Sequence, residues 1–193
     1  LEEWEDAFGG YSSLYDSAVL ENNKLLAMTG MMRSAFKGHN WVEAIKGAGL
    51  VLSDSRFDAQ TQAEAKYVKA KSYLATSRRT EAFEILSALA EDVSGQYGAE
   101  AAYMLIQDCY DRGDFEAVET KVYAFSEAGT SHMYWLAKSF IVLGDSFVER
   151  EELKQAKATF ESIRDGYEPQ NAQDDVQSNV EVRLKRLAEM MTE

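Results

Sequence analysis

Side chains that could carry out catalysis or bind a metal are few in this chain of 193 residues. It contains two histidines, His39 and His132, and one cysteine, Cys109. Neither histidine has a cysteine or carboxylate at a ligand spacing such as His-Glu-x-x-His, and these three residues cannot complete a Cys/His zinc site. A single cysteine forms no internal disulfide. The sequence therefore predicts no metal, no cofactor and no enzymatic activity.

The same three residues have ordinary structural interpretations. His39 lies between Gly38 and Asn40 in a pattern typical of a helical-hairpin turn, so we expect it to be exposed. His132 opens a helix, where a capping or surface role is expected. Cys109 falls at a position that aromatic residues occupy elsewhere in the chain, so it is expected to be a small core residue.

Glycine and methionine clusters also fail to indicate a ligand site. Gly47-Ala48-Gly49 and Gly9-Gly10 lie in helical patterns without a preceding strand, so neither is expected to bind phosphate. Met28, Met31 and Met32 form a sulfur-rich group. Their spacing places them on the packing face of a helix, which favours core over a binding surface.

Composition excludes two classes of protein. The 20 Lys and Arg against 33 Asp and Glu give a net charge of −13, which repels phosphate backbones, so we expect no nucleic acid partner. No apolar run approaches the roughly 18 residues that a membrane-spanning helix needs. Acidic residues gather in segments 1–22 and 165–181, which contain no Lys or Arg, and we expect both to be solvated.

The elements that must position these side chains are helices that repeat along the chain. Trp4-Glu5-Asp6-Ala7 recurs as Trp41-Val42-Glu43-Ala44, an offset of 37. One packing position is filled in turn by Ala35, Tyr73, Cys109 and Phe147, at offsets of 38, 36 and 38. Such self-similarity predicts a solenoid of helical hairpins.

These residues resemble the tetratricopeptide repeat family. The segment Leu143-Gly144…Phe147…Ala156…Phe160…Ile163, followed by Pro169, is the best copy of its pattern. Met32 and Ile106 depart from it, because the family prefers Gly or Ala there. The resemblance implies an all-α, right-handed superhelical array of about ten helices and no strands. More finely, the chain resembles the large tetratricopeptide proteins of Gram-negative bacterial envelopes, which implies a periplasmic or envelope-associated location.

The repeat frame predicts one domain, residues 1–193, with turns at defined glycines. The expected parts are a half repeat at 1–20 (a helix over 2–20), repeats at 22–53, 60–92 (helices over 60–76 and 78–92), 98–127 and 132–167, and a capping helix at 174–191. Gly38 and Gly113 are expected to end helices in the left-handed conformation. The last helix should bury an apolar face and expose its other face. The buried set is Val176, Val180, Leu184, Leu187 and Met191; the exposed set is Asp175, Glu181, Lys185 and Glu189.

The resemblance also implies a concave groove lined by the first helix of each hairpin. The groove positions that could bind a partner are Arg33, Phe36, Lys37, Tyr67, Lys71, Tyr103, Gln107 and Tyr110. Aromatic and cationic side chains at regular spacing suit a peptide ligand. The alternative is that the tyrosines merely pack between adjacent helices.

These patterns predict a non-catalytic scaffold that binds a protein or peptide. The alternatives are a purely structural, self-associating spacer, or a component of an outer-membrane protein assembly machinery. The chain begins with Leu1 halfway through a repeat and without a leader, so we expect a piece of a longer parent. Its first helix is then expected to expose an apolar face near Trp4, Phe8, Tyr11 and Leu14, where self-association is possible.

Overall fold

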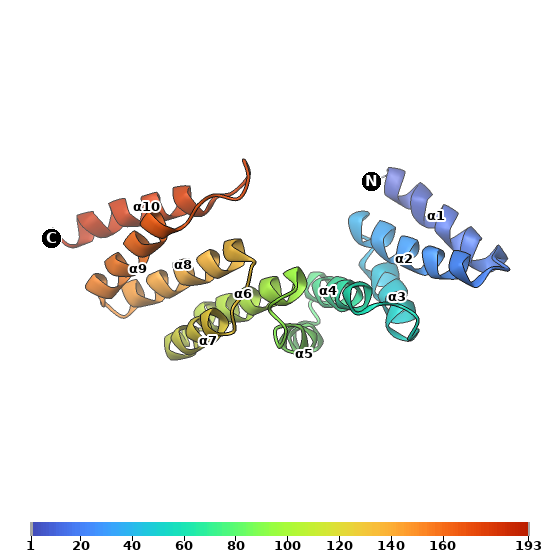
Figure 1. Ribbon diagram of the computed structural model, residues 1–193, viewed down its shortest axis with the longest axis horizontal. Coiled ribbons are helices and arrows are strands. Elements are labelled where there is room, and N and C mark those ends of the chain that lie inside the picture. The colour runs from blue at the N-terminus through green and yellow to red at the C-terminus, as the bar shows by residue number, and fades with distance from the viewer. Residues whose placement is uncertain (1, 193) are drawn as a thin grey trace. The chain divides into compact units, whose positions relative to one another are not determined.

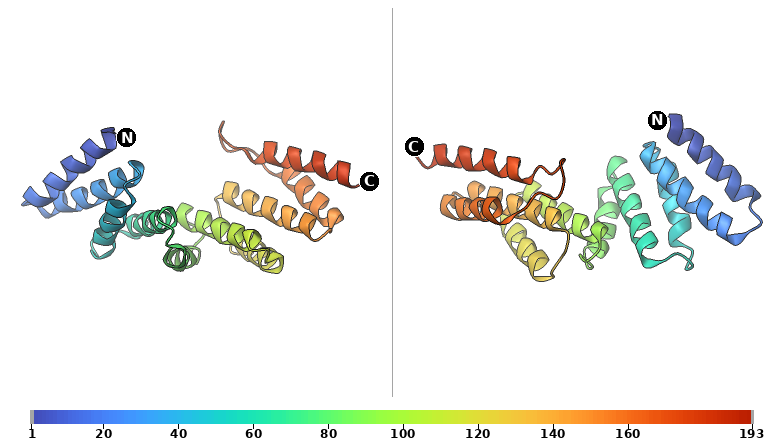
Figure 2. Two further views of the ribbon diagram at one scale, coloured as in Figure 1. Left: turned by 180° about the vertical axis from the view of Figure 1, so that it is seen from behind. Right: turned by 45° about the horizontal axis from the view of Figure 1, so that its top comes forward.

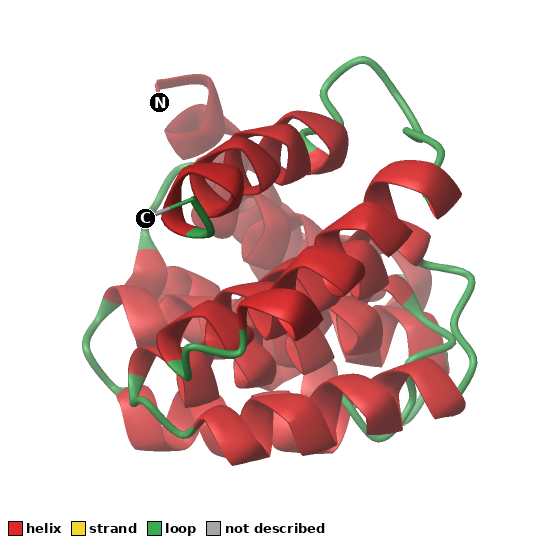
Figure 3. Cartoon of the chain, turned by 90° about the vertical axis from the view of Figure 1, so that its left-hand side faces the viewer, coloured by secondary structure: helices red, strands yellow, loops and turns green. Residues whose placement is uncertain are grey.

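The structure is a computed structural model that describes residues 2–192, and its secondary structure is helical, at 77% of the chain (Figures 1 and 3). The described residues contain no strand. The ten helices are α1 (Glu2–Ser17), α2 (Glu21–Lys37), α3 (Trp41–Leu52), α4 (Ala59–Ala75), α5 (Arg79–Leu89), α6 (Gln96–Asp111), α7 (Phe115–Glu127), α8 (Met133–Glu149), α9 (Leu153–Gly166) and α10 (Val176–Met190). The predicted all-α hairpin architecture is confirmed.

The helices divide into two compact units, Leu1–Leu89 with α1 to α5 and Ala90–Glu193 with α6 to α10. In each unit every helix packs on the next one along the chain, and the first helices of adjacent hairpins, α2 with α4 and α6 with α8, also touch (Figure 2). The last helix, α10, packs on α9 and α8. The assignment of residues 1–193 to a single domain stays a prediction.

Four hairpin turns share one backbone geometry, which confirms the repeat spacing. The residues with positive φ are His39 (58°), Ser77 (61°), Gly113 (73°) and Glu151 (60°), again at offsets of 38, 36 and 38. In each turn the amide after this residue donates to the carbonyl five residues back, as Asn40 does to Ala35 at 2.8 Å. The turn is a Schellman motif, which satisfies carbonyls that the helix end would otherwise leave unpaired.

One expected turn residue is wrong. Gly38 has a φ of −79°, and the next residue, His39, takes the left-handed conformation instead. The prediction at Gly113 is correct. The turn geometry therefore fixes the position of the left-handed residue, and only one of the four hairpins supplies glycine there, although glycine tolerates that conformation best.

The two helices of each hairpin pack through a pair of facing positions, one on each helix. A larger residue at one position is matched by a smaller residue at the other. In the fourth hairpin a β-carbon at Gly144 would collide with the ring of Phe160, so the aromatic ring fills the space that the glycine leaves. The same two positions carry Met32 with Ala48, Ala70 with Leu86, and Ile106 with Val122, all buried. The departures at Met32 and Ile106 are thus matched by smaller residues on the second helix.

Candidate binding surface

The eight predicted groove residues form two sets, one on each unit. Arg33, Phe36 and Lys37 lie on α2, and Tyr67 and Lys71 lie on α4; these belong to the first unit. Tyr103, Gln107 and Tyr110 lie on α6, in the second unit. Neither Tyr67 nor Tyr103 is fully buried, so both rings remain partly accessible.

In the first unit, the charge of Arg33 is paired within the fold. Its Nε donates to Glu64 Oε1 at 2.7 Å and its Nη2 donates to Oε2 at 2.5 Å, a bidentate contact from α2 to α4. Bidentate pairs fix the orientation of both side chains. This pair therefore ties together the first helices of adjacent hairpins, and Arg33 already has a carboxylate partner.

The other four residues of this set contact aromatic rings or carry them. Lys37 Nζ lies 4.7 Å from the centre of the Trp4 ring, and Lys71 Nζ lies 5.6 Å from the Tyr67 ring, both within cation–π range. Phe36 is half-buried and meets Trp41 edge to face, with ring centres 5.8 Å apart. Arg33, Lys37 and Lys71 are therefore all engaged in contacts with their own chain.

In the second unit, Tyr103, Gln107 and Tyr110 follow one face of α6, one turn apart. The Tyr103 ring packs at 5.3 Å from Trp135. The Gln107 side-chain Nε2 donates to Asp111 Oδ1 at 2.8 Å. The Gln107 Oε1 lies 3.5 Å from the Tyr103 hydroxyl, which donates to it. The side chains are therefore ordered by local contacts along the helix.

Tyr110 stands beside two carboxylates. Its hydroxyl lies 3.5 Å from Glu149 Oε1, and its ring packs against Phe115 at 5.8 Å between centres. Partial burial raises the pKa of Tyr110, and the nearby charges of Asp145 and Glu149 raise it further, because they disfavour a phenolate. Tyr110 therefore stays a neutral hydrogen-bond donor at neutral pH.

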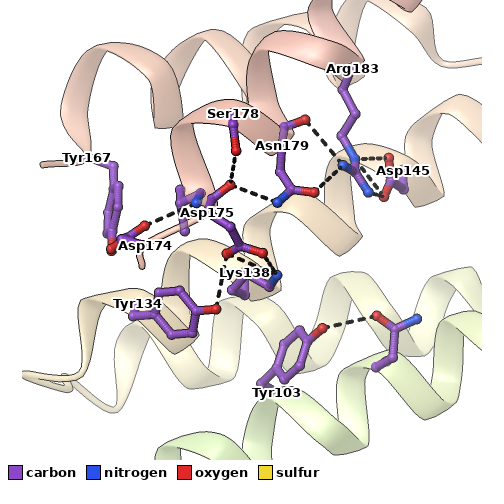
Figure 4. Close-up of polar contacts among 12 residues, drawn as sticks. Tyr103, Tyr134, Lys138, Asp145, Tyr167, Asp174, Asp175, Ser178, Asn179 and Arg183 are labelled. Carbon is purple, nitrogen blue, oxygen red and sulfur yellow. Dashed lines mark hydrogen bonds and ion pairs between the residues drawn. The ribbon is translucent and has the colours of Figure 1, made fainter. Parts of the chain in front are cut away.

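Helix α10 adds residues to this face that the sequence analysis did not include. Arg183 forms a bidentate pair with Asp145 of α8, its Nε donating at 2.7 Å and its Nη2 at 2.7 Å (Figure 4). Hydrogen bonding to this carboxylate raises the pKa of the Arg183 guanidinium. The partners lie 38 residues apart, one repeat spacing, which is the only sequence signal that could have suggested the pair.

Asp175 was expected on a solvated face, and 44% of its side chain is exposed, but its carboxylate also has partners within the fold. It precedes α10 and accepts from Lys138 Nζ at 3.0 Å and from the Tyr134 hydroxyl at 3.1 Å (Figure 4). Partial burial raises the pKa of Asp175, but these two bonds outweigh it and lower the pKa overall. The prediction that Met191 is buried is wrong, because Met191 follows the end of α10 and is 43% exposed. Val176, Val180 and Leu187 are buried, as expected, and Leu184 is partly buried.

Side chains of α6, α8 and α10 line a pocket of about 410 Å³ within the second unit. Its lining residues are Gln107, Tyr110, Val142, Asp145, Val182, Arg183 and Arg186. Val182 is an apolar side chain with 68% of its surface exposed. Among residues 2–192, Arg183 is paired with Asp145, and no carboxylate pairs with Arg186. The pocket therefore combines an apolar wall, a phenol, an amide and an uncompensated cation.

The remaining candidate residues have structural contacts. His39 is exposed and stacks on Trp41 at 5.0 Å, and His132 Nε2 lies 3.1 Å from the Ser94 carbonyl oxygen. Cys109 is buried at 2% exposure. Within the described part of the chain, no group of three His, Cys, Asp or Glu side chains could hold a metal ion. No helix there is both long enough and apolar enough to span a bilayer.

Comparisons with models of protein families, with curated proteins and with solved structures find no match for this chain. The described architecture therefore defines its class as an all-α protein of helical hairpins.

Proposed function

We propose that this protein is a non-catalytic helical-repeat scaffold, and that the pocket between α6, α8 and α10 in its second unit binds a peptide segment of a protein partner. The observation that supports this proposal is the pocket between α6, α8 and α10, in which Tyr110, Val182 and Arg186 present three different kinds of contact. Aromatic and arginine side chains at the centre of a pocket are the residues that most often dominate binding energy.

Charge defines the ligand more closely. The protein carries a net charge of −13, so a strongly acidic partner is repelled at long range. Arg186 is nevertheless an unpaired cation beside the apolar Val182 among the described residues. The proposed ligand is therefore a segment with an apolar side chain next to one acceptor group, a carboxylate or a backbone carbonyl.

The test is a selection of displayed random peptides on the wild-type chain, followed by affinity measurements on variants. Tyr110→Ala and Arg186→Gln are expected to weaken the selected peptides about tenfold each, since truncation of an interface anchor costs about 1 to 2 kcal/mol or more. Tyr123→Ala is the matched control. Tyr123 is 45% exposed and lines a different, more apolar pocket between α7, α8 and α9.

Peptides whose affinity is lost in Tyr123→Ala and retained in Tyr110→Ala would place binding on the other pocket and contradict the proposal. Failure to select any peptide would also count against it. Circular dichroism of each variant checks that a loss of affinity is not a loss of folding.

A structural spacer is the second candidate, and the first unit supports it. Arg33 of α2 already pairs with Glu64 of α4, the first helix of the adjacent hairpin. This contact stabilises the packing of the two hairpins without a ligand. Three further proposals rest on the sequence resemblance: membership of the tetratricopeptide repeat family, an envelope location and a role in outer-membrane protein assembly. The backbone geometry that the four hairpin turns share supports only the first of these.

A further inference from the structure

Another pocket of the second unit lies at the start of α8 and is rich in carboxamide side chains. It has a volume of about 330 Å³ and is formed by the first residue of α6, the start of α8 and the loop before α10. Its lining includes Gln96, Gln170, Asn171, Gln173 and Trp135. We call it the carboxamide pocket. Its volume lies at the lower end of the range for small-molecule sites, about 300 to 1,000 Å³.

Three of these carboxamides are available to a ligand. Gln96, Gln170 and Gln173 are exposed, and none of their side-chain amide groups makes a hydrogen bond to another of residues 2–192. A carboxamide offers one acceptor oxygen and two N–H donors in a single plane. Three such groups around one pocket therefore suit a ligand whose own groups both donate and accept, as hydroxyl groups do.

The other lining side chains are held in place by contacts within the fold. Trp135 is half-buried, and its ring centre lies 5.3 Å from that of Tyr103 and 4.9 Å from that of Tyr134. Asp174 accepts from the Tyr167 hydroxyl at 2.5 Å and from two backbone amides at 3.0 Å (Figure 4). The pocket therefore has an aromatic wall and a carboxylate that are ordered before a ligand binds, which lowers the entropic cost of binding.

Charge narrows the class of ligand. Of the described residues that line the pocket, none is Lys or Arg, and Asp174 contributes a carboxylate. Because the protein also carries a net charge of −13, an anionic ligand is repelled. The three hydrogen bonds that Asp174 accepts offset its charge, so the lining does not favour a cation either. These features suit a neutral ligand that is rich in hydroxyl groups.

We propose that the carboxamide pocket binds a neutral saccharide. A sugar ring has hydroxyl groups around its edge, which match the carboxamides and Asp174, and an apolar face of C–H bonds, which packs on the accessible part of the Trp135 ring. The volume of the pocket suits a monosaccharide or a disaccharide. The carboxamide pocket shares no lining residue with the pocket between α6, α8 and α10, so the two proposals can fail independently.

The test is saturation-transfer NMR on the 193-residue chain with glucose, galactose, N-acetylglucosamine and maltose as neutral probes. At least one of these sugars is expected to receive saturation at its C–H protons. Glucuronate is the anionic probe and choline the cationic probe. Each is expected to bind about tenfold more weakly than the best neutral sugar, a difference of about 1.4 kcal/mol.

Position is tested by substitutions of exposed glutamines, which remove no core contact. Gln96→Ala and Gln173→Ala are each expected to weaken the bound sugar about three- to tenfold, because each removes a hydrogen-bonding group. Gln60→Ala is the matched control, since Gln60 is also an exposed glutamine in the first turn of a helix, α4 of the first unit. It is expected to leave the affinity unchanged. Tyr110→Ala should also have no effect, which separates this site from the proposed peptide pocket.

Absence of saturation transfer to all four neutral sugars would overturn the proposal. A sugar whose affinity is unchanged in both Gln96→Ala and Gln173→Ala, or is lost equally in Gln60→Ala, would also refute it, because the sugar would then bind elsewhere. Tighter binding of glucuronate or choline than of any neutral sugar would show that the pocket selects a charged ligand and would refute the neutral class.

Discussion

Each hairpin pairs a larger side chain on one helix with a smaller one on the other. This pairing can be tested by placing the residue pair of the first hairpin at the equivalent positions of the fourth. Gly144 and Phe160 in the fourth hairpin occupy the positions of Met32 and Ala48 in the first, and all four residues are buried. We expect Gly144→Met and Phe160→Ala each to destabilise the second unit, and the double substitution to recover much of the loss.

The magnitudes follow from the contacts. Phe160 is 1% exposed, so Phe160→Ala removes a buried ring and leaves a cavity, which costs about 3 to 5 kcal/mol. Gly144→Met drives a side chain into that ring and is expected to cost about 1 to 3 kcal/mol, even after the gain in helix propensity. In the double variant the methionine occupies the cavity, so its stability should exceed the sum of the single effects by about 2 to 3 kcal/mol.

Urea unfolding followed by tryptophan fluorescence measures these differences. Trp135 is the only one of the three tryptophans in the second unit, so Trp4→Phe and Trp41→Phe give a background that reports on this unit. Additive losses within about 0.5 kcal/mol would refute the reasoning, because they would mean that the two side chains do not share one space.

Three further outcomes are expected. Ser77→Gly should stabilise the protein by about 0.5 to 1 kcal/mol and Gly113→Ala should destabilise it by about 1 kcal/mol, since both positions have positive φ; thermal melts measure both changes. Burial, followed by the bond to Asp175, raises the pKa of Tyr134 to about 12, so its stabilising contribution is complete below pH about 10 and is lost as the pH rises to about 12. Alkaline unfolding curves should show this loss in the wild type and a smaller one in Tyr134→Phe. Thr130→Val should cost about 1 kcal/mol in urea unfolding, because the hydroxyl donates at 2.7 Å to a backbone carbonyl in the segment before α6.

Local sequence was sufficient to predict the helices to within a few residues. The expected helix at 60–76 is Ala59–Ala75, whose start is fixed by Asp58 accepting from the Thr61 amide. The expected helix at 78–92 ends three residues early, at Leu89. Helix ends depend on caps and apolar spacing within about one turn of the chain, so they can be read from neighbouring residues.

The pairing of charged side chains could not be predicted in the same way. Arg33 and Glu64 are 31 residues apart, and Arg183 and Asp145 are 38 residues apart. Each contact depends on the rotation of one helix about its axis relative to its neighbour, and the repeat spacing leaves that rotation undetermined. For the same reason the contacts of Asp175 with Lys138 and Tyr134 were not predicted, and Arg186 was not recognised as part of the pocket between α6, α8 and α10.

The sequence by itself determined that this protein is all-helical, that its hairpins recur every 36 to 38 residues, and that Cys109 and most of the repeated apolar positions belong to the core. These properties follow from side-chain periodicity and turn chemistry, which act over short distances along the chain. Only the tertiary structure decided which carboxylates Arg33 and Arg183 meet, and that α10 completes a pocket with α6 and α8. Those outcomes depend on how neighbouring helices fit against each other, and that fit is set by the combined shapes of side chains that are distant in sequence.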